Sequence, residues 1–301
     1  MKTNTNSSHR GIQKVSACFI VATILLAAAS ARGEHGVSDS EIKIGMSNAQ
    51  TGNAAALGSG VKSGAETYFN KINSSGGVNG RKVNLVAYDD GYEPAKCKGN
   101  TQKLLEQDDV FALFGYVGTP TSAAILPILS NTDAIYFGPF TGAASLRTPV
   151  KKNIFNVRAS YGDETDGLVE HLTTDLKLNK VGIFIQDDAY GAAGEKGVTD
   201  ALKKRSLEVA AKGTYPRNTT DVDSAVDTLK TANPQAVVMV GAYKACAAFV
   251  KKCKAAGFNP VFCNISFVGT AAFIKEAGND GEGVFISQVM PSPFDATINI
   301  V

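Results

Sequence analysis

VFALFGYVGTPTSAAILPILSNTDAIYFGPFTGAASLR, residues 110–147, is the stretch that decides the fold. It predicts a strand, a loop, a helix, a second strand, a second loop and the start of another helix. The runs FALFG and AIYFG are apolar throughout, which is typical of parallel strands covered on both faces. Ligands of open α/β sheets bind outside the carboxyl ends of the strands, which is where both loops begin. The stretch therefore predicts an α/β sheet with two candidate ligand loops.

Both loops precede a predicted helix N-terminus. In the first, Thr119 is placed as an N-cap with Pro120 at the first helical position, where its missing N–H costs nothing. In the second, Thr141 and Gly142 precede a helix expected from Ala143 onward. Two helix N-termini side by side favour an anion, because unpaired N–H donors and the positive ends of two dipoles converge there. We therefore expect a carboxylate on a small organic ligand, although ordinary capping of two loops explains the pattern equally well.

The first 31 residues have the features of a signal peptide. Basic residues come first, residues 15–29 form an apolar run of secretory length, and Ala29-Ser30-Ala31 offers a cleavage site. Cleavage removes three basic residues and no acidic one, so the formal net charge of +2 becomes −1. A near-neutral chain argues against nucleic acid as a partner. No second apolar run is long enough to span a bilayer, so we expect a soluble product in the periplasm.

The rest of the chain alternates short apolar runs with amphipathic helical runs, twice over. In the first round, residues 42–46 and 82–87 read as strands. The chain pauses at residues 158–163, and the alternation then starts again, with strands expected at 181–186 and 236–240. Two doubly wound α/β domains account for the roughly 270 residues that follow the signal peptide.

The strands of the second round are also followed by loops with polar and aromatic residues. Residues 187–191 read DDAYG, residues 241–243 read GAY, and residues 264–267 read NISF. Two sets of such loops closing on one another would enclose a small molecule. Tyr190 and Tyr243 each line such a cleft or pack within a domain, as aromatic residues commonly do. On the helices, the charged run at residues 163–170 reads as a solvated face, with Leu168, Leu172 and Leu176 on the buried side.

Several short motifs in this order resemble a known family. They are Thr51-Gly52 with Gly58, GGVNGRKV, Asp89-Asp90, FGYVGTPTSAAILP, FGPFTGA, DAYG and NISFVG. From about residue 37 to the end, the chain resembles the periplasmic solute-binding proteins of the branched-chain amino acid (Leu/Ile/Val-binding) type, which serve ABC importers. The resemblance implies a type I clamshell with an N-terminal lobe (37–157) and a C-terminal lobe (158–287) joined by hinge strands. It also implies that a ligand is held between the lobes and not chemically changed.

The resemblance further assigns residues to the ligand site. Thr119 stands where family members carry a serine that holds the ligand carboxylate. Gly142 stands where they carry a threonine, and the neighbouring Thr141 could supply the missing hydroxyl. Tyr190 and Tyr243 match tyrosines that line the cleft.

Ser266 departs from the family pattern. Family members carry an acidic residue at this position, and it pairs with the ligand ammonium. A buried ammonium without a carboxylate partner is costly. Either Asp187 or Asp188 takes that role, or the ligand carries no ammonium.

The end of the chain departs as well. Family members continue past the QVMPSPF stretch with elements that complete the N-terminal lobe. We therefore expect residues 288–301 to be an incomplete hinge return of a C-terminally truncated product, with apolar faces of the first lobe left exposed.

The resulting prediction is an extracytoplasmic protein that captures a small carboxylate-bearing solute, with a branched-chain amino acid as the first candidate. It would deliver this solute to the membrane permease of an ABC transporter. The alternatives are a ligand-sensing module of a signalling system and a binder of aromatic acids or short amides. We expect no enzyme and no cofactor. Gly58, Gly60 and Gly64 lack the spacing of a dinucleotide fingerprint, and residues 45–49 lack the last glycine of a nucleophile elbow.

Four cysteines would survive cleavage of the signal peptide. Cys253 and Cys263 are separated by a helix end, a turn and a short strand, so they either form a disulfide in an oxidising compartment or stay as buried thiols. A metal site is not expected, because the mature chain would hold only two histidines.

Overall fold

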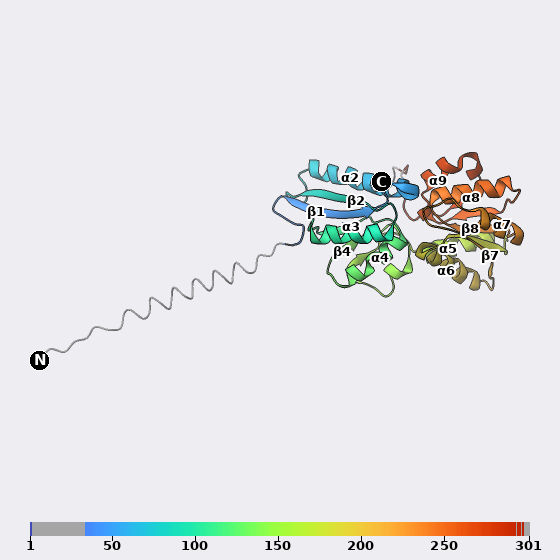
Figure 1. Cartoon of the computed structure of the whole chain (residues 1–301), viewed down its shortest axis with the longest axis horizontal. Helices are drawn as coiled ribbons and strands as arrows, with labels where there is room; N and C mark the ends of the chain where they lie inside the picture. Colours follow the sequence, from blue (N-terminus) through green and yellow to red (C-terminus); the bar gives the residue numbers. More distant parts are fainter. Residues whose placement is uncertain (2–33, 293, 296, 298–301) are drawn as a thin grey trace.

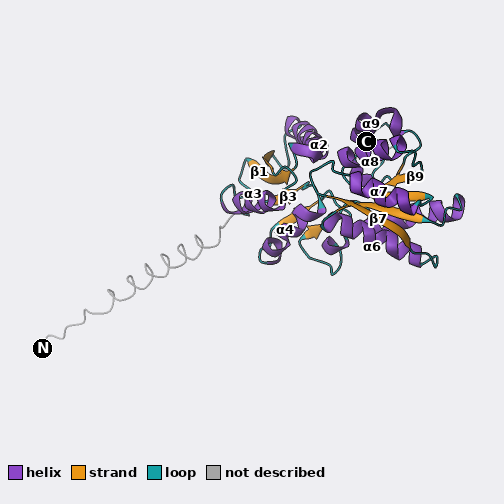
Figure 2. Ribbon diagram, turned by 45° about the vertical axis from the view of Figure 1, so that its right-hand side comes forward, coloured by secondary structure: helices purple, strands orange, loops and turns teal. Residues whose placement is uncertain are grey.

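The computed structural model describes residue 1, residues 34–292, residues 294–295 and residue 297. Figures 1 and 2 show two α/β lobes side by side, each with helices packed against a sheet. Each described sheet has five strands, and all strand pairings are parallel. The predicted fold class, two parallel-sheet lobes of the type I clamshell, is therefore confirmed. The predicted signal peptide, residues 1–31, lies outside the described residues except for Met1.

The first lobe begins the chain that the structure describes. Its elements are β1 (Glu41–Asn48), α2 (Ala55–Ser74), β2 (Lys82–Asp89), α3 (Pro94–Glu106), β3 (Ala112–Phe114), α4 (Thr119–Ser130), β4 (Ile135–Phe137) and β5 (Ile154–Phe155). The strand order is β2-β1-β3-β4-β5. Figure 1 shows α2 on one side of this sheet and α3 and α4 on the other.

One face of the first sheet is only partly covered. Tyr136 of β4 is fully buried, whereas the next residue, Phe137, is 42% exposed, and Phe155 of β5 is 46% exposed. On this face α2 extends as far as β3, where the rings of Phe69 and Phe114 lie 6.1 Å apart. The interpretation of AIYFG as a strand covered on both faces is therefore wrong, because no described helix lies over Phe137. The expectation that apolar faces of the first lobe are exposed is confirmed.

The second lobe has a sheet whose central strands, β6 and β8, are covered on both faces. Its elements are α5 (Tyr161–Glu170), β6 (Val181–Gln186), α6 (Ala189–Lys203), β7 (Val209–Tyr215), α7 (Asp223–Ala232), β8 (Ala236–Val240), α8 (Tyr243–Ala255), β9 (Val261–Asn264), α9 (Thr270–Ala277) and β10 (Phe285–Ile286). The strand order is β10-β9-β8-β6-β7. Every residue of β6 and β8 is buried, and both strands have the predicted bounds.

The core of the second lobe continues into the first lobe. The same cluster of buried apolar side chains that contains β6 and β8 also contains Leu57, Tyr92 and Val117 of the first lobe. Other buried residues of the first lobe form a separate, smaller cluster around Leu113 and Tyr136. The two lobes are thus packed against each other, and the residues at the carboxyl ends of both sheets are enclosed between them.

Candidate functional site

The cleft between the lobes is closed by direct hydrogen bonds. The Tyr243 hydroxyl, at the start of α8, accepts from the Ala56 N–H of α2 at 3.3 Å. At the rim, Arg217 Nη2 donates to Glu93 Oε2 at 2.9 Å, and Asn218 Nδ2 donates to Glu93 Oε1 at 2.6 Å. Each of these bonds joins one lobe to the other. The structure is therefore that of a closed clamshell, as a ligand-enclosing protein would adopt with its ligand bound.

A chain of buried hydroxyls runs from the first lobe to the second. Thr119 Oγ1 and Thr141 Oγ1 lie 2.7 Å apart, with Thr119 as the donor because the single Thr141 proton is used elsewhere. Thr141 Oγ1 donates to the Tyr161 hydroxyl at 3.2 Å and also accepts from the Ala143 N–H at 3.2 Å. Burial raises the pKa of the Tyr161 hydroxyl, and the positive charge of Arg158 together with the threonine hydrogen bonds offsets part of this rise. The two predicted loops therefore do meet, side chain to side chain.

The local helix geometry differs from the prediction. Gly118, with a φ of 108°, is the N-cap of α4, and Thr119 is the first helical residue. The predicted N-cap at Thr119 is therefore wrong, because its hydroxyl bonds to Thr141 instead of to its own helix. After the second loop, only a three-residue 3₁₀ turn forms, Ala144–Leu146. The expected second helix dipole is therefore absent from this loop, and the hydroxyls are the polar feature of the site.

Gly142 lies against the second lobe. Its carbonyl accepts from the Tyr161 N–H at 2.8 Å. A Cβ atom at this position would lie 2.6 Å from Tyr161 Cδ1 and 2.7 Å from Tyr161 N, closer than real Cβ contacts come. Gly142 therefore allows the close approach of α5 to the loop, and the hydroxyl at this end of the site comes from Thr141.

Tyr190 lies in the interior of the closed structure. It is fully buried. Its ring centroid lies 4.4 Å from that of Phe267 and 5.5 Å from that of Tyr161. Its hydroxyl has no hydrogen-bond partner among the described residues. A buried polar group without a partner is costly, so this hydroxyl is a natural point of contact for a ligand. Tyr243, by contrast, uses its hydroxyl to hold the lobes together.

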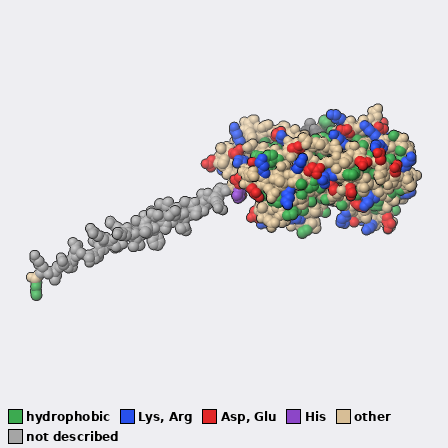
Figure 3. Space-filling view, viewed as in Figure 1, with side chains coloured by type: hydrophobic (Ala, Val, Ile, Leu, Met, Phe, Trp, Pro, Cys, Tyr) green, Lys and Arg blue, Asp and Glu red, His purple; other side chains and the backbone are tan. Residues whose placement is uncertain are grey.

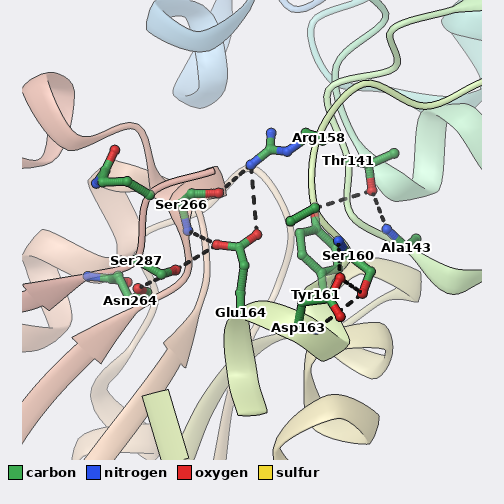
Figure 4. A network of polar contacts seen from close by, with 12 residues as sticks. Thr141, Ala143, Arg158, Ser160, Tyr161, Asp163, Glu164, Asn264, Ser266 and Ser287 are labelled. Atoms are coloured by element: carbon green, nitrogen blue, oxygen red, sulfur yellow. Dashed lines mark hydrogen bonds and ion pairs between the residues drawn. The ribbon is translucent and has the colours of Figure 1, made fainter. Parts of the chain in front are cut away.

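Ser266 is part of a buried charged cluster that sequence reasoning missed (Figure 4). Its N–H donates to Glu164 Oε2 at 2.7 Å, and its hydroxyl accepts from Arg158 Nη2. The Ser287 hydroxyl donates to the same Glu164 oxygen at 2.6 Å. Arg158 Nη2 and Glu164 Oε1 are 3.9 Å apart, and their side chains are only 6% and 2% exposed. Figure 4 shows Glu164 reaching up from α5 toward Ser266, with the Arg158 guanidinium above it.

The signal that could have found this cluster is helical spacing. The interpretation of residues 163–170 as a solvated helix face is wrong at Glu164, which is 6% exposed. Glu164 lies four residues before Leu168, a position already assigned to the buried side of the helix. Arg158 and Ser266 carry no comparable signal, because their contact joins residues 108 positions apart.

The two aspartates considered as ammonium partners differ in their surroundings. Asp188 is the N-cap of α6, and its Oδ1 accepts from the Tyr190 N–H at 2.9 Å. Its Oδ2 accepts from Gln186 Nε2 at 2.7 Å and lies 3.5 Å from Arg217 Nη1. Asp187 is exposed. The carboxylate that contacts Ser266 is therefore that of Glu164.

Cysteines and histidines contribute no site of their own. Cys97, Cys246, Cys253 and Cys263 are all free and buried, so of the two alternatives for Cys253 and Cys263 the structure shows buried thiols. Burial raises the pKa of both thiols to about 12. Among the described residues, no group of three or more His, Cys, Asp or Glu side chains is placed to hold a metal ion.

Helix hydropathy and surface charge are two further features of the described residues. In the part of the chain that the structure describes, no helix combines the length and the hydropathy needed to cross a bilayer. On the face shown in Figure 3, blue basic and red acidic side chains are interspersed over both lobes.

Comparisons with known proteins agree on the family. The model of the periplasmic binding protein family matches residues 41–298. Leu/Ile/Val-binding protein homolog 3 of Brucella melitensis is 28% identical over 209 residues, which are 68% of this chain and 55% of that protein. Homolog 7 of Brucella abortus is 24% identical over 79% of this chain and 61% of its own length. The chain thus spans somewhat more than half the length of these relatives.

Solved structures give the same picture. A possible leucine/isoleucine/valine-binding protein from Rhodopirellula baltica has a TM-score of 0.81 and 33% identity, over 87% of this chain and 72% of that one. A substrate-binding periplasmic protein from Ralstonia solanacearum has a TM-score of 0.80 and 32% identity, over 84% and 72%. Both are named as binding proteins, and the family is extracytoplasmic. The chain belongs to the periplasmic binding protein family, of the Leu/Ile/Val-binding type.

Proposed function

We propose that this protein captures a small carboxylate-bearing solute between its lobes in the periplasm and delivers it to the membrane permease of an ABC transporter. The observation that carries the proposal is the buried hydroxyl chain of Thr119, Thr141 and Tyr161 at the closed seam. It joins residues of both lobes, so a ligand held there would favour closure over opening.

Unused hydrogen-bond donors between the two lobes support an anionic group on the ligand. Thr141 donates to the Tyr161 oxygen, and no hydrogen bond within the described residues uses the Tyr161 O–H proton. The hydroxyl of Tyr190 and the Nε of Arg158 are buried and also lack partners there. A carboxylate accepts several hydrogen bonds and donates none, so it can satisfy such a set of donors.

The names of the relatives suggest where to begin with ligands. The Brucella and Rhodopirellula proteins are named for leucine, isoleucine and valine, so branched-chain amino acids and their analogues are the first members of the carboxylate class to test. Delivery to a permease is supported by family membership.

The binding step is tested with the purified protein in a thermal-shift and calorimetric screen of amino acids, aliphatic and aromatic acids, and short amides. A ligand that binds the folded state raises the melting temperature by mass action. We expect stabilisation by carboxylates, and if only compounds without a carboxylate stabilise the protein, the proposal fails.

The Thr119→Val variant tests the hydroxyl chain itself. Without the Thr119 hydroxyl, Thr141 loses the hydrogen bond that orients its own hydroxyl toward Tyr161, so the best carboxylate should bind about 10-fold more weakly. Thr101→Val is the matched control, because Thr101 is equally buried and also bonds a tyrosine hydroxyl, that of Tyr116 at 3.0 Å, but within the first lobe. Equal affinities for Thr119→Val and Thr101→Val would remove the hydroxyl chain from the site.

The delivery step needs its own measurement. The protein loaded with its ligand is added to liposomes that contain the permease and ATPase subunits from the same genome. Ligand-dependent stimulation of ATP hydrolysis is expected. Stimulation of a sensor kinase in the same format, without any effect on the transporter, would favour the sensing alternative.

A further inference from the structure

A cavity of about 450 Å³ opens beside the hydroxyl chain, between the lobes and the hinge. Its walls come from the loop after β4, the segment between β5 and α5, the loop after β9 and the segment after β10. Most of the lining is apolar: Pro139, Phe140, Val157, Val289, Met290 and Pro291. A space of this volume and composition is suited to the apolar body of a small ligand.

Arg158 alone is charged among the described residues that line this cavity. Its guanidinium carbon lies 4.5 Å from the ring centroid of Phe140, so the group stacks on that ring. Within the described residues, its side chain forms a hydrogen bond through Nη2, to Ser266, and the buried Nε has no partner. The guanidinium of Arg158 is therefore held in place by Phe140 and Ser266 and still has N–H groups that can donate to a ligand.

Arg158 also lies near the hydroxyl chain. Its positive charge is one of the influences that lower the pKa of Tyr161 against the larger effect of burial. Phe140, on which Arg158 stacks, immediately precedes Thr141 in the chain. An acceptor placed at this end of the cavity would therefore meet the guanidinium, which lines the cavity, whereas Thr119, Thr141 and Tyr161 lie buried behind the lining.

The nearby carboxylate is poorly placed for a ligand ammonium. Glu164 is not among the residues that line the cavity. One of its oxygens is held by the Ser266 N–H and the Ser287 hydroxyl, and the other lies 3.9 Å from Arg158. An ammonium in the cavity would meet the guanidinium before it reached Glu164, and like charges that lie close together repel each other.

We propose that the cavity takes the apolar body of the ligand and that Arg158 binds its carboxylate, so that the preferred ligand is an apolar monocarboxylate without an ammonium group. This inference rests on the proposed solute-binding function and narrows its ligand class. It makes Arg158, which the sequence motifs did not single out, the residue that determines specificity.

The test compares three ligands of one shape by calorimetry on the wild-type protein: leucine, 4-methylpentanoate and 4-methylpentanamide. The second lacks only the ammonium of leucine, and the third replaces the carboxylate of the second with a neutral amide. We expect 4-methylpentanoate to bind at least about 10-fold more tightly than either of the others, since each loses a charge-assisted contact or gains a repulsion. Leucine binding as tightly as 4-methylpentanoate overturns the inference, and so does equal binding of the amide.

The Arg158→Gln and Arg158→Lys variants test the residue directly. Arg158→Gln should weaken 4-methylpentanoate about 10- to 100-fold, with Arg158→Lys between it and the wild type, because Lys keeps the charge without the planar donor fork. Arg205→Gln is the control, since Arg205 pairs with Asp166 on the far side of α5 and does not line the cavity. Equal affinity in Arg158→Gln and Arg205→Gln overturns the assignment of Arg158.

The two proposals fail in different ways. If leucine binds and 4-methylpentanoate does not, the ligand class inferred from the cavity is wrong and solute binding stands. If neither these nor longer aliphatic and aromatic carboxylates bind, capture of a carboxylate is wrong, and the inference falls with it.

Discussion

The two lobes contain sheets of the same size but differ in how completely those sheets are buried. In the second lobe, every residue of β6 and β8 is buried. In the first lobe, Phe137 of β4 and Phe155 of β5 are nearly half exposed, and their ring centroids lie 6.4 Å apart on the open face. Both strands of the first lobe are as apolar as those of the second. An apolar run therefore predicts a strand but does not predict what covers it.

The largest expected effect comes from the covered sheet. Phe184 of β6 is fully buried, and its ring centroid is 4.0 Å from that of Phe249 and 5.1 Å from that of Tyr215. Phe184→Ala should lower the free energy of unfolding by about 3–5 kcal/mol, because a large cavity forms in a packed core. Urea unfolding followed by circular dichroism measures this change. A loss below about 1 kcal/mol would mean that the second lobe is no better packed than the open face of the first.

Each lobe contains a buried acid, Glu164 in the second and Asp90 in the first. Asp90 is fully inaccessible, accepts from the Ser47 hydroxyl at 2.8 Å and the Tyr92 N–H at 2.8 Å, and burial raises its pKa to about 6. A carboxyl whose pKa is higher in the folded state binds its proton more tightly there. Its contribution to stability is therefore fully present below pH 4 and is lost as the pH rises through 6.

The Asp90→Asn variant measures this contribution. Asn does not titrate. Between pH 4 and pH 7, the unfolding free energy of the wild type should therefore fall by about 2–3 kcal/mol relative to that of the variant. Asp133→Asn is the control, since Asp133 is exposed and pairs with Lys152 at the surface. The same pH dependence in both variants would show that burial of Asp90 has no influence.

The sequence predicted the fold to a large extent because the fold depends on local patterns. Alternating apolar and amphipathic runs gave both sheets, and β6 and β8 have the expected bounds. The site was predicted in part. Thr119 and Thr141 do meet, but as a pair of hydroxyls bonded to each other and not as two helix caps. The geometry of a turn depends on single φ angles, such as that of Gly118, which periodicity does not reveal.

The charged cluster was missed for a different reason. Arg158, Glu164 and Ser266 come from the hinge, a helix and a loop, and their contacts depend on how the hinge packs against the second lobe. An acidic residue on a helix is usually exposed to solvent, and this general tendency led to the prediction of a solvated Glu164. The four-residue spacing between Glu164 and Leu168 indicated instead that Glu164 lies on the buried side of the helix. Long-range placement of this kind follows from tertiary packing and has no local pattern.

The smallest expected effect is also the sharpest test of the contrast between the lobes. Phe137→Ser removes a ring as large as that of Phe184 from a strand of the same kind, but this ring is 42% exposed. Because much of the ring is already in contact with water, its removal should cost less than half of what Phe184→Ala costs, about 1–2 kcal/mol in the same urea experiment. The variant should also bind less of a dye that reports exposed apolar surface, since the aromatic row of Phe114, Phe137 and Phe155 is interrupted. A cost equal to that of Phe184→Ala, with unchanged dye binding, would mean that the open face of the first sheet is covered in solution and that the two lobes are alike.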